Sequence, residues 1–381
     1  MDYGFTYNEI FSAFEDCLRN KKSTQGAKEF CMNKVDNLIN LTDEINNKTY
    51  AIGTSRAFVI TDPKLREVFA ADFRDRIVHH LVIRELEPHF ENYFIKDTYS
   101  CMKGRGTLHG VQRLATLIEE KSNSYTTPYY IAKLDYKAFF MSIDKQLLCK
   151  RLLEFIELVY PENRKKPYLL WLCELIVLHH PEDNCKRVGN ISLWGRLSPD
   201  KSLFKVGKDK GLAIGNLTSQ MFANFYLTPV DYYIIYVLGL DLVRYADDFV
   251  IGHSNLEYLK YCIPIIRAFA LTEVKLVIHP DKLYMQECNK GITFIGGVIR
   301  PHRIYCGNRA VGKLYNRIST RFPVFNQQDL QDFMSSMNSY LGLMRHYKTY
   351  KIRREVLKNH IKSWLPYIII GKNYLNVNIT Q

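Results

Sequence analysis

The chain has 381 residues, 47% hydrophobic and 13% aromatic, and its 52 Lys and Arg residues outnumber 39 Asp and Glu to give a formal net charge of +13. This composition excludes a disordered polar chain, and the positive charge favours a polyanion such as nucleic acid over a membrane or an acidic metabolite. No apolar run reaches 18 residues and the acidic start is not typical of a signal peptide, so we expect a cytoplasmic protein with no membrane partner.

The cysteines and histidines do not form recognisable metal sites. Nine cysteines are scattered along the chain without any Cys-x2-Cys pair, which predicts reduced thiols and neither a zinc knuckle nor a disulfide framework. The pairs His79-His80 and His179-His180 are poor metal ligands, because consecutive side chains point apart on a helix or strand. We expect structural roles for these histidines.

The first 50 residues have apolar positions at helical spacing, as in NEIFSAFEDCLRNKK, and predict helices. Two groups of positive residues follow. Arg74 and Arg76 precede a further helical pattern, and Lys103 and Arg105 lie in a turn flanked by glycines. These four side chains are candidates for charge-assisted hydrogen bonds to phosphate oxygens.

The segment PYYIAKLD alternates into a predicted strand from Tyr129 to Leu134, after which the pattern becomes helical. Asp135 ends this strand, where a carboxylate points out of the sheet edge and can meet a ligand. Alternatively, Asp135 caps the following helix. The stretch from about 156 to 206 has clusters of Pro, Gly and charged residues and predicts an insertion with exposed loops.

Two glycines and small polar residues in GLAIGNLTSQ, residues 211–220, precede a long helical pattern. Such a loop can bring its backbone close to a bound nucleotide or template, and we expect Ser219 and Gln220 to open the helix. The alternative is an ordinary helix start.

The segment LDLVRYADDFVIGHS predicts a tight β-hairpin with Asp247 and Asp248 at its tip. Burying two adjacent carboxylates without compensation is costly, because each loses its hydration and repels the other. Divalent cations held by oxygen ligands are the usual solution, and two such ions can stabilise the attacking and leaving oxygens of a phosphoryl transfer. A solvated turn is the alternative for this motif taken alone.

Taken together, these motifs resemble those of bacterial reverse transcriptases. Asp135 matches the first palm aspartate, residues 211–220 the template-positioning motif, and Tyr245 to Asp248 the Tyr-x-Asp-Asp box. Further blocks fit the family at RDRIVHHLV 74–82, CMKGRGTLHG 101–110, HPDKLYMQ 279–286 and ITFIGGVI 292–299.

The resemblance implies an α+β right-hand polymerase fold. It divides the chain into a helical N-terminal lead-in, fingers, a palm built on an antiparallel sheet, and a helical thumb. The expected ranges are 1–55 for the lead-in, 56–128 for the fingers, 129–300 for the palm with its insertion at about 156–206, and 301–381 for the thumb.

The resemblance also implies the roles of the site residues. Asp135 and Asp247 would hold two Mg²⁺ ions, for which Mn²⁺ is a possible substitute, with weaker help from Asp248 and an oxygen from the backbone carbonyl of Tyr136. The expected nucleotide-binding residues are Arg74, Arg76, Lys103, Arg105, Phe140, Ile214, Gly215, Gln220 and Lys282. The primer grip is expected at Phe294, Ile295, Gly296 and Gly297.

Two of these roles have open alternatives. Phe140 is expected to lie under the sugar of the incoming nucleotide and to exclude a ribose 2′-hydroxyl, with Phe139 in the core; an ordinary core Phe is the alternative. Lys282 is a candidate to protonate the leaving pyrophosphate, or else a surface lysine.

Within the family, the string from Ile214 to Gln220 is similar to the Ile-Gly-x-x-x-Ser-Gln signature of diversity-generating retroelements. Ile214 replaces a Gln whose amide braces the nucleotide, which implies low fidelity, particularly opposite template adenines. The implied function is RNA-templated synthesis of complementary DNA for mutagenic retrohoming. The implied partners are a template-repeat RNA, the primer-template, deoxynucleoside triphosphates and a small basic accessory protein.

Two alternatives to this function remain. A retron, abortive-infection or group II intron-like reverse transcriptase shares the same catalytic acids. A non-catalytic RNA-binding scaffold of the same fold is the other alternative.

Overall fold

The computed structural model describes residues 4–19, 21–62, 64–319, 327–359, 361 and 364–380. Its elements form mainly antiparallel sheets together with many helices, which confirms the predicted α+β class. In the described part of the chain, no helix combines the length and the apolar character that crossing a membrane requires.

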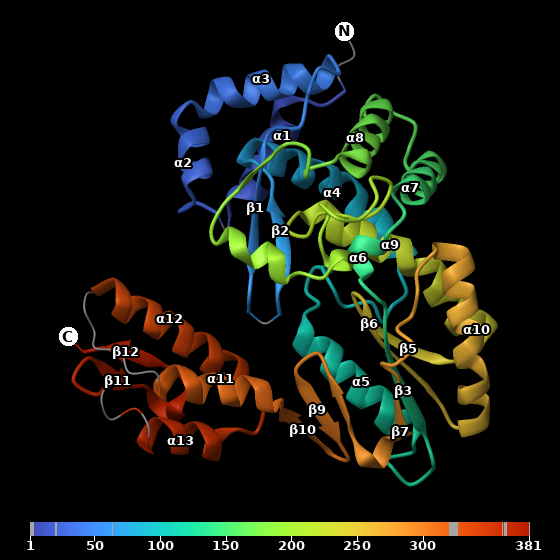
Figure 1. The fold of residues 1–381 in the computed structure, drawn as a ribbon, viewed down its shortest axis with the longest axis vertical. Helices are drawn as coiled ribbons and strands as arrows, with labels where there is room; N and C mark the ends of the chain where they lie inside the picture. The colour runs from blue at the N-terminus through green and yellow to red at the C-terminus, as the bar shows by residue number, and fades with distance from the viewer. Residues whose placement is uncertain are drawn as a thin grey trace.

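Three helices at the N-terminal end lie at the top of Figure 1; the first two pack on the long helix α4, and the third packs on the first two. They are α1 (Tyr7–Leu18), α2 (Gln25–Met32) and α3 (Lys34–Asn46), and α4 spans Phe73–Tyr93. The side chain of Thr6 caps α1 in a capping box with Glu9, which satisfies amide groups that the first helical turn leaves free. The apolar faces of these helices join the largest hydrophobic core.

A three-stranded sheet lies beside these helices, in the order β2-β1-β4. Strands β1 (Ser55–Ile60) and β2 (Arg66–Ala70) are antiparallel, and β4 (Cys185–Arg187) adds in parallel from the segment predicted as an insertion. The buried carboxylate of Glu67 in β2 accepts hydrogen bonds from Trp194 Nε1, Ser202 Oγ and the Leu203 amide, each 2.7 Å long. The insertion is therefore fixed to the β1-β2 hairpin.

The central sheet is antiparallel, with the order β5-β6-β3-β7. Its strands are β3 (Tyr130–Asp135), β5 (Asp241–Tyr245), β6 (Asp248–His253) and β7 (Tyr284–Glu287). One face packs against helices of the largest core, and the other face packs against α5. Helix α5 spans Thr107–Lys121, and besides α4 the largest core contains α6 (Phe139–Ser142), α7 (Lys145–Val159), α8 (Lys166–Leu178), α9 (Leu217–Tyr232) and α10 (Leu256–Val274).

A second three-stranded sheet, β10-β9-β8, packs against α5. Its strands are β8 (Ile292–Phe294), β9 (Gly297–Arg300) and β10 (Arg303–Cys306). Since β9 pairs with β10, this sheet continues across the expected boundary between palm and thumb at residue 300.

The C-terminal segment forms a separate hydrophobic core, at the lower left of Figure 1. It contains α11 (Asn308–Ser319), α12 (Gln327–Met344), α13 (Tyr350–Asn359) and a small hairpin of β11 (Ile368–Ile370) with β12 (Val377–Ile379). Lys313 of α11 forms an ion pair with Asp62 in the turn between β1 and β2. The four domain ranges expected from the sequence stay a prediction.

Candidate active site

Three carboxylates meet at one end of the central sheet, two from the turn between β5 and β6 and one from the end of β3. The hairpin closes through Ala246 and Asp247, and Ala246 has a φ of 53°, which suits the tight two-residue turns of hairpins. Asp248 opens β6 directly opposite Asp135, the last residue of β3. Asp135 caps no helix, because Ala138 precedes α6 and the side chain of Asp144 caps α7.

Two lysines neutralise part of this acidic group. Lys282 Nζ lies 2.7 Å from Asp135 Oδ2, and Lys133 Nζ lies 3.3 Å from Asp248 Oδ1. Burial, followed by the charges of Asp248 and Asp135, raises the pKa of Asp247 to about 6. The hairpin tip therefore carries an excess of negative charge that a cation can relieve.

The donor set at this tip fits a hard divalent cation. Its groups are carboxylate oxygens, which suit Mg²⁺ or Mn²⁺ better than softer metals. Tyr136 pairs with Ile278 through two hydrogen bonds that use the carbonyls of Asp135 and Val277, so this bridge leaves the carbonyl oxygen of Tyr136 unused. Across the described residues, however, no three His, Cys, Asp or Glu side chains are already grouped as a metal site. The lysine ammonium groups lie beside two of the carboxylates instead.

A pocket beside Asp135 and Asp248 brings further positive charge to the acids. It is lined by Lys64, Lys133, Leu134, Asp135, Asp248, Lys282, Leu283 and Tyr284. The charge of Arg66, at the start of β2, also acts on Asp247. The sequence did not single out Lys64, Arg66 or Lys133. Lys133 could have been found from the alternation of β3, because it lies two residues before Asp135 and shares its face.

Of the five positive residues selected from the sequence as nucleotide-binding candidates, Lys282 lines this pocket and the other four lie elsewhere. Arg74 pairs with Glu44, and its guanidinium lies 4.9 Å from the centre of the Tyr50 ring. Arg76 Nε donates to the carbonyl of Ala71 at 2.9 Å.

Arg105 Nη1 donates to the carbonyls of Lys96 and Thr98, and Lys103 is exposed. None of these four side chains is among the described residues that line the pocket beside Asp135 and Asp248. Their role in binding nucleotides stays a prediction.

The loop at 211–216 connects the segment after Asp135 to the β1-β2 hairpin. The amide of Leu212 donates to the carbonyl of Phe140, and the amide of Phe69 in β2 donates to the carbonyl of Ile214, each at 2.8 Å. Gly215 has a φ of 125°, and a Cβ added there would lie 2.8 Å from the carbonyl oxygen of Phe69. A glycine is required here for the close approach of two backbones.

Helix α9 begins at Leu217, with Asn216 as its N-cap, two residues before the predicted start at Ser219. Ile214 is half-buried among the apolar residues that include Phe69. Gln220 is exposed, and its side-chain oxygen accepts a hydrogen bond from the Cys101 thiol.

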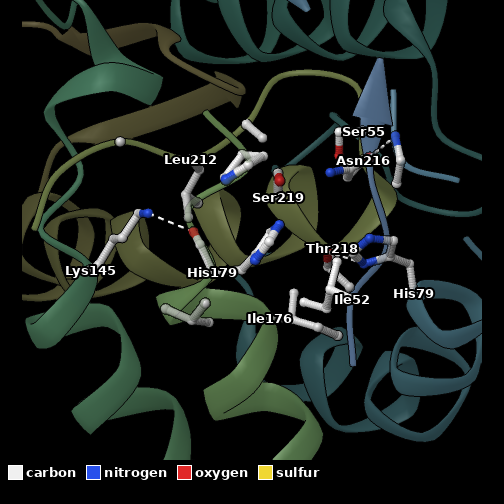
Figure 2. Close-up of a pocket in the computed structure, with 15 residues that line it drawn as sticks. Ile52, Ser55, His79, Lys145, Ile176, His179, Leu212, Asn216, Thr218 and Ser219 are labelled. Atoms are coloured by element: carbon white, nitrogen blue, oxygen red, sulfur yellow. Dashed lines mark hydrogen bonds between the residues drawn. The ribbon is translucent and has the colours of Figure 1, made fainter. Parts of the chain in front are cut away.

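Figure 2 shows the cavity behind this loop, where Thr218 and Ser219 face residues of α4, α7 and α8. Thr218 Oγ1 and His79 Nδ1 are 2.9 Å apart, and Lys145 Nζ donates to the carbonyl of His179 at 2.7 Å. Burial lowers the pKa of His79 to about 3, so the ring is neutral at physiological pH. These contacts confirm the structural role predicted for His79.

Phe139 lies in the core as predicted, but its ring and that of Phe140 stay in contact. Phe139 is buried, whereas Phe140 is only half-buried and packs edge to face against Phe139 with the ring centres 5.2 Å apart.

At the predicted primer grip, Ile295 and Gly296 form the turn between β8 and β9 with φ angles of 38° and 91°. Phe294 is buried, and a Cβ added at Gly297 would lie 2.6 Å from Val111 of α5. The functions of Phe140 and of this turn stay predictions.

Residues 61–299 match the model of the family described as Reverse transcriptase (RNA-dependent DNA polymerase), which is more than half of the chain. The chain belongs to the reverse transcriptase family. The matched range contains Asp135, the loop at 211–220 and the Asp247-Asp248 hairpin. Among curated proteins, none matches this reverse transcriptase.

Several solved structures of telomerase are similar to this reverse transcriptase. Apo telomerase of Candida tropicalis truncated from its C-terminal domain shares 11% identity at a TM-score of 0.49, covering 67% of this chain and 55% of that one. Apo telomerase of Candida tropicalis shares 13% identity at a TM-score of 0.48, covering 83% and 58%. Telomerase of Candida albicans with a fragment of telomeric RNA shares 13% identity at 0.45, covering 81% and 55%. This reverse transcriptase thus spans little more than half the length of these telomerase chains.

The raised pKa of Asp247 predicts how stability depends on pH in the metal-free reverse transcriptase. Between the ordinary value of 3.8 and about 6, the folded protein holds a proton that the unfolded chain releases. The free energy of unfolding therefore falls as pH rises through this window, and the penalty is complete above pH about 6. In EDTA, we expect Asp247→Asn to melt a few degrees higher than the parent at pH 7.5 and no higher at pH 4, measured by circular dichroism. Equal differences at both pH values would contradict this prediction.

Proposed function

We propose that this protein is an RNA-directed DNA polymerase, a nucleotidyltransferase whose chemistry takes place at Asp135, Asp247 and Asp248. The observation that carries the proposal is the pairing of Asp135 with Asp248 across β3 and β6, one residue from the tip where Asp247 lies. Two divalent ions, Mg²⁺ or in its place Mn²⁺, would supply charge neutralisation and acidify the primer 3′-hydroxyl. Asp135, Asp247, Asp248 and the carbonyl of Tyr136 would hold them.

The positive residues around the acids suit the triphosphate of an incoming nucleotide. Lys64 and Lys133 line the same pocket as Asp135, and the charge of Arg66 acts on Asp247. Charge-assisted hydrogen bonds from such groups hold phosphate oxygens and balance the charge that develops on them during transfer. Lys282 would donate a proton to departing pyrophosphate, and its ion pair with Asp135 supports this role.

Primer extension on a poly-rA template with an oligo-dT primer tests the proposal. We expect incorporation of dTTP that requires Mg²⁺ or Mn²⁺ and disappears in EDTA. An absence of product with either metal, from protein shown to be folded, would contradict the proposal and favour an RNA-binding scaffold.

We further propose low-fidelity synthesis, biased at template adenines, in a diversity-generating retroelement. Ile214 supports this, because its half-buried aliphatic side chain contacts apolar neighbours and offers no hydrogen bond to a nucleotide. Template-repeat RNA would be the substrate, and a small basic accessory protein the partner, in mutagenic retrohoming.

Ile214→Gln is expected to lower misincorporation opposite template adenine by about 10-fold, since one restored polar contact is worth on the order of 1–1.5 kcal/mol. Sequencing of complementary DNA copied from a defined RNA measures this change. Ile214→Val, which keeps the apolar contact, is the matched control and should retain the parental error spectrum. An unchanged spectrum in the Gln variant would contradict the assignment.

A further inference from the structure

A buried ion pair lies directly behind the acidic hairpin. Arg244 of β5 is 1% exposed and Asp231 of α9 is 2% exposed. Arg244 Nε lies 2.9 Å and 2.8 Å from the two carboxylate oxygens of Asp231, and Nη2 lies 2.6 Å from Oδ2. The guanidinium is thus oriented by a bidentate contact, the geometry in which an arginine is most rigidly held.

The remaining donors of Arg244 connect three parts of the chain. Nη1 donates to Asn224 Oδ1 at 2.9 Å and to the carbonyl oxygen of Ala246 at 3.3 Å. Nη2 lies 3.4 Å from Thr98 Oγ1, and Asn224 Nδ2 donates to the carbonyl of Ser100 at 2.7 Å. One side chain therefore links α9 and the segment 98–100 to the turn that carries Asp247.

Two hydrogen bonds to the segment 97–99 also hold the backbone of Arg244. Its amide donates to the carbonyl of Asp97, and its carbonyl accepts from the amide of Tyr99, each at 3.0 Å. The strand is therefore held on both sides only two residues before Ala246. The hairpin tip itself bears carboxylates that repel one another, so it needs such external support to keep its conformation.

We infer that Arg244 and Asp231 are positioning residues that hold the Ala246-Asp247 turn, and thereby set how tightly the three carboxylates bind divalent cations. This inference rests on the proposed function. Arg244 acts through Ala246 and touches no reacting atom. Supporting groups behind metal ligands typically change metal affinity or activity by roughly 10–100-fold when they are removed.

The test compares two variants. Arg244→Met combined with Asp231→Leu removes both charges together and fills the space with apolar groups, a replacement that buried ion pairs often tolerate. Arg244→Lys keeps the charge next to Asp231, but its ammonium cannot make the guanidinium fork to Asp231, Asn224 and Ala246.

Mn²⁺ binding, measured by electron paramagnetic resonance on the full chain, is the readout that does not need activity. We expect both variants to stay folded, with a Mn²⁺ dissociation constant raised roughly 10–100-fold. Their kcat should fall by a similar factor, while the KM for primer-template stays unchanged.

Tyr129→Phe is the matched control. It removes the 2.8 Å hydrogen bond from the Tyr129 hydroxyl to Asp241 Oδ2 at the opposite end of the same strand β5. It should lower the melting temperature and leave Mn²⁺ binding unchanged.

If the folded double variant binds Mn²⁺ as tightly as the parent, the inference is overturned, and the ion pair only stabilises the fold. Failure of the parent to extend a primer would instead count against the proposed function, and the Mn²⁺ titration would still decide the inference.

Discussion

Asp247→Asn is expected to slow primer extension by roughly 1,000-fold or more. An amide keeps the shape of the side chain but removes the negative charge with which Asp247 would hold a cation. Losing several kcal/mol of stabilisation by metal ions corresponds to this factor, because each 1.4 kcal/mol is tenfold in rate. Single-turnover incorporation of dTTP at saturating Mg²⁺ measures it.

Asp241→Asn is the matched control for this prediction. Asp241 lies at the other end of β5 and pairs with Lys121 and Tyr129, so its replacement changes the same strand away from the hairpin tip. We expect its rate to stay within a few-fold of the parent. Parental rates from folded Asp247→Asn would contradict the whole assignment of the site.

Phe140→Ala is expected to lower the preference for deoxynucleotides over ribonucleotides by about 5–150-fold. Fitting an extra hydroxyl into a well-packed site costs about 1–3 kcal/mol, and this cost disappears when the ring is removed. The half-exposed ring of Phe140 is available for such a contact, and its backbone is tied to Leu212 of the loop at 211–216. The ratio of kcat/KM for dTTP and UTP on the same primer-template measures the change.

Phe139→Leu separates sugar discrimination from packing. Phe139 is buried between Tyr136 and Phe140, so its replacement should lower thermal stability without changing the dTTP to UTP ratio. If Phe140→Ala leaves this ratio unchanged, Phe140 is an ordinary packing residue.

The central features of the site could be predicted because they depend on local patterns. Alternation specifies β3, continuous runs of apolar, β-branched and aromatic residues specify β5 and β6, and the short turn then places Asp247 and Asp248 at the end of the sheet. The start of α9 was predicted two residues late, although Asn216 is a favoured N-cap residue and could have indicated it.

The rest depends on contacts between residues distant in the sequence. Lys64, in the turn between β1 and β2, lines the same pocket as Asp135 and Asp248 because the fold brings this turn next to the central sheet. Arg244 pairs with Asp231 only because α9 packs on that sheet. Arg74 was selected for its charge, yet Glu44 and Tyr50 hold it. No local pattern distinguishes a positive side chain paired with another helix from one that lines a pocket.

A backbone hydrogen bond joins the residue before α11 to the turn between β8 and β9. The amide of Gly307 donates to the carbonyl of Gly296 at 2.9 Å, and a Cβ added at Gly307 would lie 2.8 Å from that same oxygen. The two backbones touch where no side chain fits, next to a helix whose core is separate from that of the sheet. A rotation of the C-terminal helices would therefore pull directly on Ile295 and Gly296, so the turn predicted as the primer grip and the angle of these helices would change together.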